Sequence, residues 1–345
     1  MATLYLHIGM PKTGSTAIQN AFADGKEHLA GRGVGYFDLG TNHSSLFKAL
    51  FRGEKEKPKK IPKFFRKTLD AESRLAGVNR DALVQAFDRA LAANTMPKLV
   101  MSAEMLFWFR PKHVAAMKAH LSPFFDRIRI VAYVRDPVSW ASSNVQQIMK
   151  HTKQTLEKVC DPKAIAAGKS PIVPAYRAGL EPYIQLFGRE AVDIRLFDRG
   201  SFVGGDLISD FCAAVGEPSL AGGLTGRIRN PSLSYEAVLL VDQYKASLAA
   251  REDQNLLAKV ATFHKRMKGL EGTRFVLPRE TLEQVRTAVA DDVGWLRGIM
   301  KADIFADSYS TEAANGPAWS ASTLRQLAEL IDQGSPARPL NRTSP

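Results

Sequence analysis

Short apolar runs alternate with longer segments of helical periodicity along the first two thirds of the chain. Four runs rich in Val, Ile and Leu are typical of buried strands, at residues 3–8, 98–102, 128–134 and 192–197. Two segments carry apolar side chains at helical spacing, at residues 81–93 and 114–124. Strands that alternate with helices form parallel sheets joined by crossover helices. The pattern therefore predicts an α/β fold with a parallel sheet flanked by helices.

The last third of the chain has the pattern of helices alone. Residues 235–262 and 279–300 are helical by pattern, so we expect a helical C-terminal part from about 231 to 334. The residues that follow, 335–345, are rich in Pro, Ser and Arg, which predicts a disordered tail. The 345 residues, of which 45% are hydrophobic, suffice to bury the core of one large domain. We therefore expect a single domain over residues 1–334.

A long helical insertion, at residues 41–79, separates the first strand and helix from the next strand. Within it, residues 52–67 carry eight basic side chains against two acidic ones. Two interpretations are open. Most charge runs are solvated loops, but a basic segment of this kind also fits a mobile lid over an anionic acceptor.

The most informative segment of the sequence lies at residues 4–16. An apolar run leads into a turn and then into hydroxyl residues that open a helix. A strand, a tight turn and a helix N-terminus direct several backbone N–H groups to one spot, which favours a bound phosphate. Gly9 and Gly14 have the separation of a Walker loop, but Ser15 stands where that loop has its lysine. The lysine, Lys12, lies inside the loop, and this suits a phosphate-bearing donor other than a typical triphosphate, including a sulfonate donor.

A second helix N-terminus follows the predicted strand at residues 128–134. Asp136 has the character of an N-cap, and Pro137 that of a first helical residue. Arg135 therefore lies at the end of the strand, and Ser143 lies near the same end of the sheet. A guanidinium that contacts two oxygens, together with a hydroxyl, favours a second phosphate at this place.

These two motifs, in this order, resemble those of sulfotransferases that use 3′-phosphoadenosine 5′-phosphosulfate (PAPS). The first resembles the family's 5′-phosphosulfate loop, with its Pro-Lys-x-Gly-[Ser/Thr]-Thr core, and the second resembles its 3′-phosphate motif, an arginine followed eight residues later by a serine. Residues 98–104 resemble the strand that delivers the catalytic base, and residues 192–212 resemble the next strand and helix. Residues 229–233 resemble an Asn-x-Ser-Leu element of bacterial members. The resemblance covers roughly the first two thirds of the chain and implies a P-loop NTPase-like sheet.

The resemblance also implies how the donor is bound. Charge builds on the oxygen that bridges sulfur and phosphorus, and Lys12 is the candidate cation that stabilises the leaving nucleotide. Arg135 and Ser143 are expected to hold the 3′-phosphate, with Arg229 as a further contact. The 5′-phosphate is expected to lie on the start of the helix, at Thr13, Gly14, Ser15 and Thr16. The product would be 3′,5′-bisphosphoadenosine (PAP), and no metal is required because a sulfuryl group carries less charge than a phosphoryl group.

An acceptor hydroxyl must lose a proton, so the reaction needs a general base within hydrogen-bond reach. Glu104 follows the strand at residues 98–102, at the sheet end where open α/β folds place their ligands. His43 has a suitable unperturbed pKa and lies in the polar segment that leads into a helix. Glu104 can equally be a surface carboxylate or a structural partner for an arginine, whereas His43 can be a solvated histidine near the helix cap. We favour Glu104 narrowly as the base.

Charge and cysteine content add to the expected surroundings of the protein. The formal net charge of +12 favours anionic partners and tilts the expected acceptor towards a carbohydrate or glycolipid, including acidic ones. We expect no nucleic-acid partner, because no aromatic residues interleave with a basic stripe. Peripheral membrane contact stays open. Two cysteines, no signal peptide and no membrane-length window predict a cytoplasmic protein with reduced thiols.

The sequence therefore predicts a sulfotransferase that moves a sulfuryl group from PAPS to a hydroxyl or amine. A kinase-like phosphotransferase is one alternative, although it would need its lysine where Ser15 stands. A non-catalytic protein that binds nucleotide or nucleic acid is the other. It explains the charge but leaves the paired phosphate motifs without a reason. The acceptor and the oligomeric state are not readable from the sequence.

Overall fold

The computed structural model describes residues 2–52, 80–224, 232–305 and 316–332. The chain divides into two compact units, each assembled from separated segments. The first unit consists of residues 1–136, 175–229 and 292–303, and the second of residues 137–174, 230–291 and 304–345. The expected single domain over residues 1–334 thus corresponds to two compact units in the structure.

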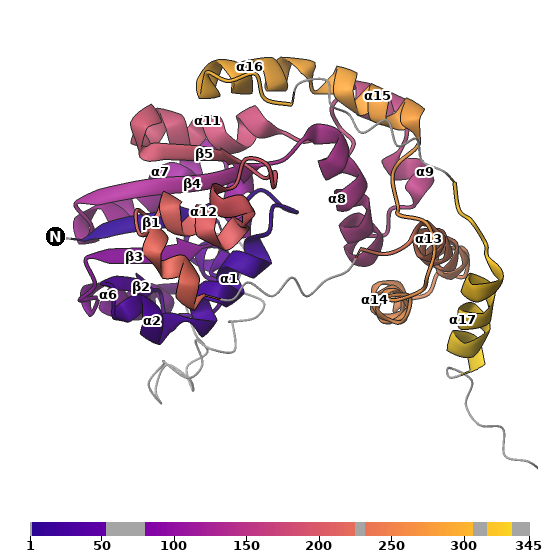
Figure 1. The fold of residues 1–345 in the computed structure, drawn as a ribbon, viewed down its shortest axis with the longest axis horizontal. Helices are drawn as coiled ribbons and strands as arrows, with labels where there is room; N and C mark the ends of the chain where they lie inside the picture. Colours follow the sequence, from indigo (N-terminus) through magenta and orange to yellow (C-terminus); the bar gives the residue numbers. More distant parts are fainter. Residues whose placement is uncertain (1, 53–79, 225–231, 306–315, 333–345) are drawn as a thin grey trace, which may run out of the picture. The chain divides into compact units, whose positions relative to one another are not determined.

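Among the described residues, one sheet of five parallel strands forms the centre of the first unit (Figure 1). The strands are β1 (Thr3–His7), β2 (Val34–Tyr36), β3 (Lys98–Ser102), β4 (Arg127–Val134) and β5 (Val192–Leu196), in the spatial order β2-β3-β1-β4-β5. The central strand β1 pairs with β3 on one side and β4 on the other, with His7 opposite Ser102 and Val131. The predicted α/β class with a parallel sheet is confirmed, and the four predicted strands lie within one residue of their expected bounds.

Helices cover both faces of this sheet (Figure 1). The helices and 3₁₀ turns of the first unit are α1 (Ser15–Asp24), α2 (Lys26–Ala30), α3 (Ser44–Phe51), α6 (Arg80–Ala92), η1 (Glu104–Trp108), α7 (Pro111–Leu121), η2 (Ser122–Phe124), α11 (Tyr176–Phe187), η3 (Arg189–Ala191), η4 (Val203–Gly205), α12 (Leu207–Ala214) and η5 (Pro218–Gly223). Most of α16 (Ala290–Met300) also belongs to this unit.

One face of the sheet is covered by α1 and α12. Ile18, Ala21 and Phe22 recur at helical spacing on α1 and are buried with Phe211 of α12 and Val131 of β4. The rings of Phe22 and Phe211 meet edge to face, with centroids 5.0 Å apart. Burial of each such ring contributes about 1.5–3 kcal/mol. This packing fixes the N-terminal end of α1 beside the end of β1.

A buried ion pair holds the end of β5 to α12. The guanidinium of Arg195 donates to both carboxylate oxygens of Asp210, at 2.6 and 2.8 Å, and the hydroxyl of Tyr133 donates to Asp210 at 2.7 Å. The backbone N–H of Val203 donates to the same carboxylate. These donors lower the pKa of Asp210 against the opposing effect of its burial. The segment that follows β5 is thereby fixed at both ends.

The second unit is a helical assembly with its own apolar core. Its helices are α8 (Pro137–His151), α9 (Leu156–Val159), α10 (Pro162–Ala166), α13 (Tyr235–Ala250), α14 (Leu256–Arg266), α15 (Arg279–Ala288) and α17 (Ala321–Asp332). Apolar side chains of α8, α13, α14 and α15 form one buried cluster, which includes Val145, Val241, Val260 and Val285. The predicted helical C-terminal part is confirmed within the described residues, and α8 to α10 join it.

Two details differ from the expected elements. The helix expected over residues 235–262 is interrupted, because Glu252 has a φ of 52° and the Asp253 carboxylate accepts from the N–H of Asn255, so α13 ends at Ala250. β2 was not predicted, because three residues centred on Gly35 are too few to show the pattern of apolar positions that indicates a strand. Across the described part of the chain, no helix is both long and apolar enough to cross a membrane.

Candidate functional site

The carboxyl ends of four strands meet at one edge of the sheet. β1 is followed by the loop at residues 8–14, β3 by Glu104, β4 by Arg135 and β5 by Phe197. In open parallel sheets, ligands bind outside the carboxyl ends of the strands. They bind where the connections from two neighbouring strands go to opposite faces of the sheet. The structure thus brings together most of the residues that the sequence selected.

The backbone of the β1–α1 loop is shaped for an anion. Lys12 and Gly14 both have left-handed conformations, with φ values of 66° and 75°. Of the first four N–H groups of α1, those of Ala17 and Ile18 donate to the carbonyl of Gly14. In the described part of the structure the N–H groups of Ser15 and Thr16 have no acceptor. Unsatisfied N–H groups at a helix N-terminus are what a bound phosphate or sulfate oxygen accepts from.

Gly14 is required by its surroundings as well as by its backbone. A Cβ atom at this position would lie 2.3 Å from Leu207 and 2.9 Å from the ring of Phe197. The positive φ of Gly14 would strain any other residue in addition. Close packing of the loop against the segment after β5 is therefore possible only with glycine.

Two unsatisfied polar atoms lie beneath the loop. Nε2 of His7 and Oγ of Ser15 are buried and have no hydrogen-bond partner among the described residues. Both lie beside Gly9, where an added Cβ would be 2.3 Å from Oγ of Ser15 and 3.0 Å from Nε2 of His7. The Ser15 hydroxyl is thus buried beneath the loop, whereas Thr16 is exposed. The two hydroxyls expected to hold a phosphate therefore have different surroundings.

A buried hydrogen-bond chain connects the ends of β1 and β3. Gln19 donates to Oγ of Ser102 at 3.1 Å, and Oγ of Ser102 lies 2.8 Å from Nδ1 of His7. A hydroxyl has two acceptor lone pairs besides its proton, so Ser102 can accept from Gln19 and still either donate to or accept from Nδ1 of His7. Burial lowers the pKa of His7 to about 3, so the imidazole is neutral. The chain fixes the strand ends on which the loop and Glu104 are mounted.

Arg135 reaches the same loop from β4. Its Nη1 donates to the carbonyl of Lys12 at 3.1 Å, and its guanidinium lies 5.6 Å from the centre of the Phe197 ring. The hydroxyl of Tyr176 donates to the Arg135 carbonyl at 2.6 Å. Arg135 is therefore anchored by its backbone, by its side chain and by the ring below it.

Glu104 lies in the electrostatic field of Lys12. Burial raises the pKa of Glu104, and the positive charge of Lys12 opposes that rise. The Glu104 carboxylate makes no hydrogen bond or ion pair to the described residues. A carboxylate with a raised pKa beside a phosphate-type loop has the properties of a general base.

His43, the other candidate base, has a structural role. Its Nδ1 accepts from the N–H of Ser102 at 3.0 Å, and its Nε2 donates to the carbonyl of Phe37 at 3.0 Å. The side chain is fully buried, and burial lowers its pKa to about 4. Both ring nitrogens are thus occupied by backbone partners, and no proton acceptor is left for a substrate. The helix it precedes, α3, was expected, but the polar sequence around His43 did not indicate its burial.

We expect acid to destabilise the fold through these neutral histidines. The folded-state pKa values, about 3 for His7 and about 4 for His43, lie below the usual value of 6.5. At a pH between the folded value and 6.5, each histidine therefore takes up a proton when the protein unfolds. The free energy of unfolding should fall with decreasing pH, by up to about 1.4 kcal/mol per pH unit for each histidine. Urea unfolding of the wild type and His43→Gln between pH 7 and pH 5 measures this. An equally steep fall in the variant would contradict it.

The remaining predicted residues are Ser143, Arg229 and the basic segment at residues 52–67. Ser143 lies on α8 in the second unit, whereas Arg135 belongs to the first. Arg229 and residues 53–79, which include most of the basic 52–67 segment, lie outside the described residues. Within the described ranges, no group of three His, Cys, Asp or Glu side chains gathers as a metal site would require.

Several residues of the site were not selected from the sequence. Gln19, Ser102, Tyr176 and Phe197 support the loop, the two strand ends and Arg135. Ser102 carried a signal, as the last residue of a predicted strand at the ligand-binding edge. Gln19 lies on α1 close to the loop, but its partner Ser102 is distant in sequence, and Tyr176 and Phe197 are themselves distant, so no local pattern reveals these contacts.

No protein-family model matches this chain, and neither does any curated protein. Solved structures of low similarity include a sulfotransferase from Alicyclobacillus acidocaldarius, with 14% identity, a TM-score of 0.40 and coverage of 75% of this chain and 95% of the other. The sulfotransferase domain of the Synechococcus PCC 7002 olefin synthase has 15% identity, a TM-score of 0.34 and coverage of 83% and 94%. A retinol dehydratase in complex with retinol and PAP has 14% identity, a TM-score of 0.32 and coverage of 84% and 81%. Similarity at this level does not establish a shared activity, so the function has to follow from the residues of the chain itself.

Proposed function

We propose that this protein transfers a sulfuryl group from PAPS to an acceptor hydroxyl. The observation that carries the proposal is the pairing of an anion-binding loop with a carboxylate of raised pKa, through Lys12 and Glu104. A loop that binds the donor and a base that deprotonates the acceptor are the two parts that such a transfer needs.

In the proposed reaction the acceptor oxygen attacks sulfur and its proton passes to Glu104. The bond between sulfur and the bridging oxygen breaks, and PAP leaves with the additional negative charge on its 5′-phosphate. Lys12, with the N–H groups of Ser15 and Thr16, would stabilise that charge. Every atom of the sulfuryl group goes to the acceptor, and neither an oxidant nor a reductant is needed.

The proposal also explains the position of the lysine. A Walker lysine follows the second glycine and opens the helix, whereas Lys12 precedes Gly14 and has a left-handed backbone. The sequence motifs support Arg135 and Ser143 as the proposed contacts of the 3′-phosphate, with Arg229 as a further candidate. The resemblance of the two motifs to the sulfotransferase family supports the choice of PAPS over a triphosphate.

Calorimetric binding of PAP, 5′-AMP and ATP without added metal tests the donor. We expect a strong preference for PAP, and Arg135→Ala should weaken PAP binding roughly 10- to 100-fold while changing 5′-AMP binding little. The matched control is Arg129→Ala, an exposed arginine of the same strand that donates to the Glu190 carbonyl. If Arg135→Ala weakens the binding of PAP and of 5′-AMP equally, Arg135 does not contact the 3′-phosphate. A Mg²⁺-dependent preference for ATP would instead favour a phosphotransferase.

A further inference from the structure

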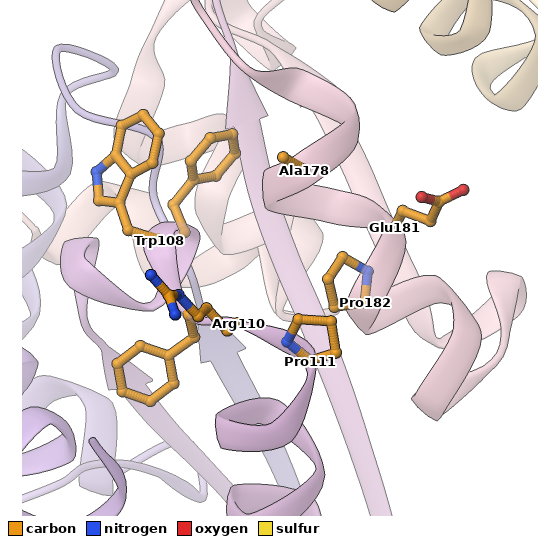
Figure 2. Close-up of a pocket in the computed structure, with 8 residues that line it drawn as sticks. Trp108, Arg110, Pro111, Ala178, Glu181 and Pro182 are labelled. Carbon is orange, nitrogen blue, oxygen red and sulfur yellow. The ribbon is translucent and has the colours of Figure 1, made fainter. Parts of the chain in front are cut away.

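A pocket of about 340 Å³ lies between η1 and α11, entirely within the first unit (Figure 2). Its size falls at the lower end of the range of small-molecule sites. Most of its lining is apolar, and a single guanidinium joins it. The residues concerned are Phe107, Trp108, Pro111, Ala178 and Pro182, with Arg110.

The two walls of the pocket are held together independently of any ligand. The hydroxyl of Tyr183 on α11 donates to the carbonyl of Leu106 on η1 at 2.7 Å. The ring of Phe107 lies on Gly179 so closely that an added Cβ would be 2.4 Å from it. The pocket is therefore preformed, and binding there does not have to order its walls.

The pocket adjoins the candidate base through η1 itself. Glu104 is the first residue of this 3₁₀ helix, and Phe107 and Trp108 are its last two. Side chains three residues apart are eclipsed on a 3₁₀ helix, which rises about 2 Å per residue. Glu104 and Phe107 are three residues apart and therefore lie on the same face of η1. Their positions are separated by roughly 6 Å along the helix axis.

The charge at the pocket is positive and uncompensated. Arg110 makes no hydrogen bond or ion pair to any described side chain. Burial lowers the pKa of His113, and the positive charges of Lys112, Arg52 and Arg110 lower it further. The acid that lines the pocket, Glu181, already accepts from Arg177 at 3.0 Å. Figure 2 shows the Glu181 carboxylate well apart from Trp108 and Arg110.

We infer that this pocket binds the acceptor, and that the acceptor carries an apolar ring and an anionic group that pairs with Arg110. The ring lies among Trp108, Phe107 and Pro182, and the reacting hydroxyl extends along η1 towards Glu104. This assignment rests on the proposed function, because Glu104 acts on a hydroxyl only if the protein is a transferase of this kind.

The lining favours an apolar ring over a carbohydrate. A sugar exposes several hydroxyls, each of which requires a donor or an acceptor when it is buried. The polar side-chain groups of the lining are Arg110, Glu181 and the indole N–H of Trp108, and Glu181 is engaged by Arg177. The pocket therefore argues against the carbohydrate that the net charge favoured, while it keeps the expected negative charge of the acceptor.

Calorimetry with para-hydroxyphenylpropanoate and its uncharged amide tests the anionic group, using the full chain with and without PAP. We expect the acid to bind about 10-fold more tightly than the amide, and Arg110→Gln to remove that preference. Lys112→Gln is the matched control, since it removes an equal charge from the neighbouring position outside the pocket lining, and it should keep the preference. Equal binding of acid and amide by the wild type, or no binding of either, would overturn the inference.

Two further comparisons test the ring and separate the two proposals. Trp108→Ala should weaken binding of both probes about 10-fold, whereas Trp319→Ala, which removes a similarly exposed tryptophan of the second unit, should not. Tighter binding of methyl glucuronide, an anionic sugar, than of the phenolic acid would overturn the choice of an apolar ring. If PAP fails to bind, the proposed function fails, while the preference between acid and amide still decides the pocket.

Discussion

Lys12→Met is expected to lower kcat for sulfuryl transfer by about 10²–10³-fold while changing PAP affinity by less than about 10-fold. The substitution keeps an unbranched side chain at a position with a φ of 66°, so the backbone strain of the loop is unchanged. The substitution removes the ammonium group, with its charge and its hydrogen-bond donors. That charge interacts most strongly with the oxygen that becomes negative as the donor breaks, and less with the ground state.

Stopped-time assays of sulfated product together with calorimetric binding of PAP measure the two quantities separately. Lys48→Met is a suitable control, because Lys48 lies exposed on α3. A variant that loses binding and turnover in equal proportion would show that Lys12 contributes uniform binding. An unchanged kcat would remove Lys12 from the chemistry altogether.

Glu104→Gln is expected to reduce kcat/KM by about 10²–10⁴-fold, the usual contribution of a general base. The amide has nearly the same size and cannot accept the proton. Because burial raises the pKa of Glu104, the wild-type rate should rise with pH through a pKa above the ordinary glutamate range, as the carboxylate loses its proton. The variant should lose that dependence on pH along with its rate.

The pH profile of kcat/KM for both proteins, with Glu27→Gln of α2 as an exposed control, tests this assignment. If Glu104→Gln is slow but its kcat/KM still falls at low pH as in the wild type, the base is another residue. His43 is not the expected substitute, since both of its ring nitrogens are bonded to the backbone of Phe37 and Ser102. Its replacement should alter stability and leave the acid limb in place.

The two residues draw their proposed roles from opposite electrostatic effects. Lys12 lies in a loop whose unsatisfied N–H groups add to its positive charge. Glu104 is partly buried without a hydrogen-bonding partner in the described structure, which makes its charged form costly and its proton affinity high. The positive charge of Lys12 opposes that rise in the pKa of Glu104 and so favours the ionised carboxylate that a base requires.

The positions of four strands and of the loop along the chain could be predicted because their causes are local. Continuous apolar runs specify buried strands, and a glycine-containing turn before a helix specifies where an anion binds. The same reasoning placed Glu104 and Arg135 at strand ends, and all such ends in a parallel sheet lie at one edge. These parts of the site can be predicted because each depends on a pattern only a few residues long.

The environment of each side chain could not be predicted in this way. His43 has a polar sequence on both sides, yet the fold buries it between the backbones of Phe37 and Ser102. Phe197, which follows β5, contacts Gly14 and Arg135 although it lies more than sixty positions beyond Arg135 in the sequence. The pocket needs Gly179 and Pro182 of α11 against Phe107 of η1, a pairing set by helix packing on the sheet.

The sequence by itself determined the α/β class, the anion-binding loop with Lys12 inside it, and the two candidate bases. Only the tertiary structure distinguished the surroundings of those two residues, because the burial and hydrogen bonds of His43 and Glu104 depend on residues far away in the chain. It alone also produced the pocket beside η1 and the isolation of Arg110 from acidic partners. A local pattern fixes the backbone path, whereas desolvation and charge pairing are set by whichever segments the fold brings into contact.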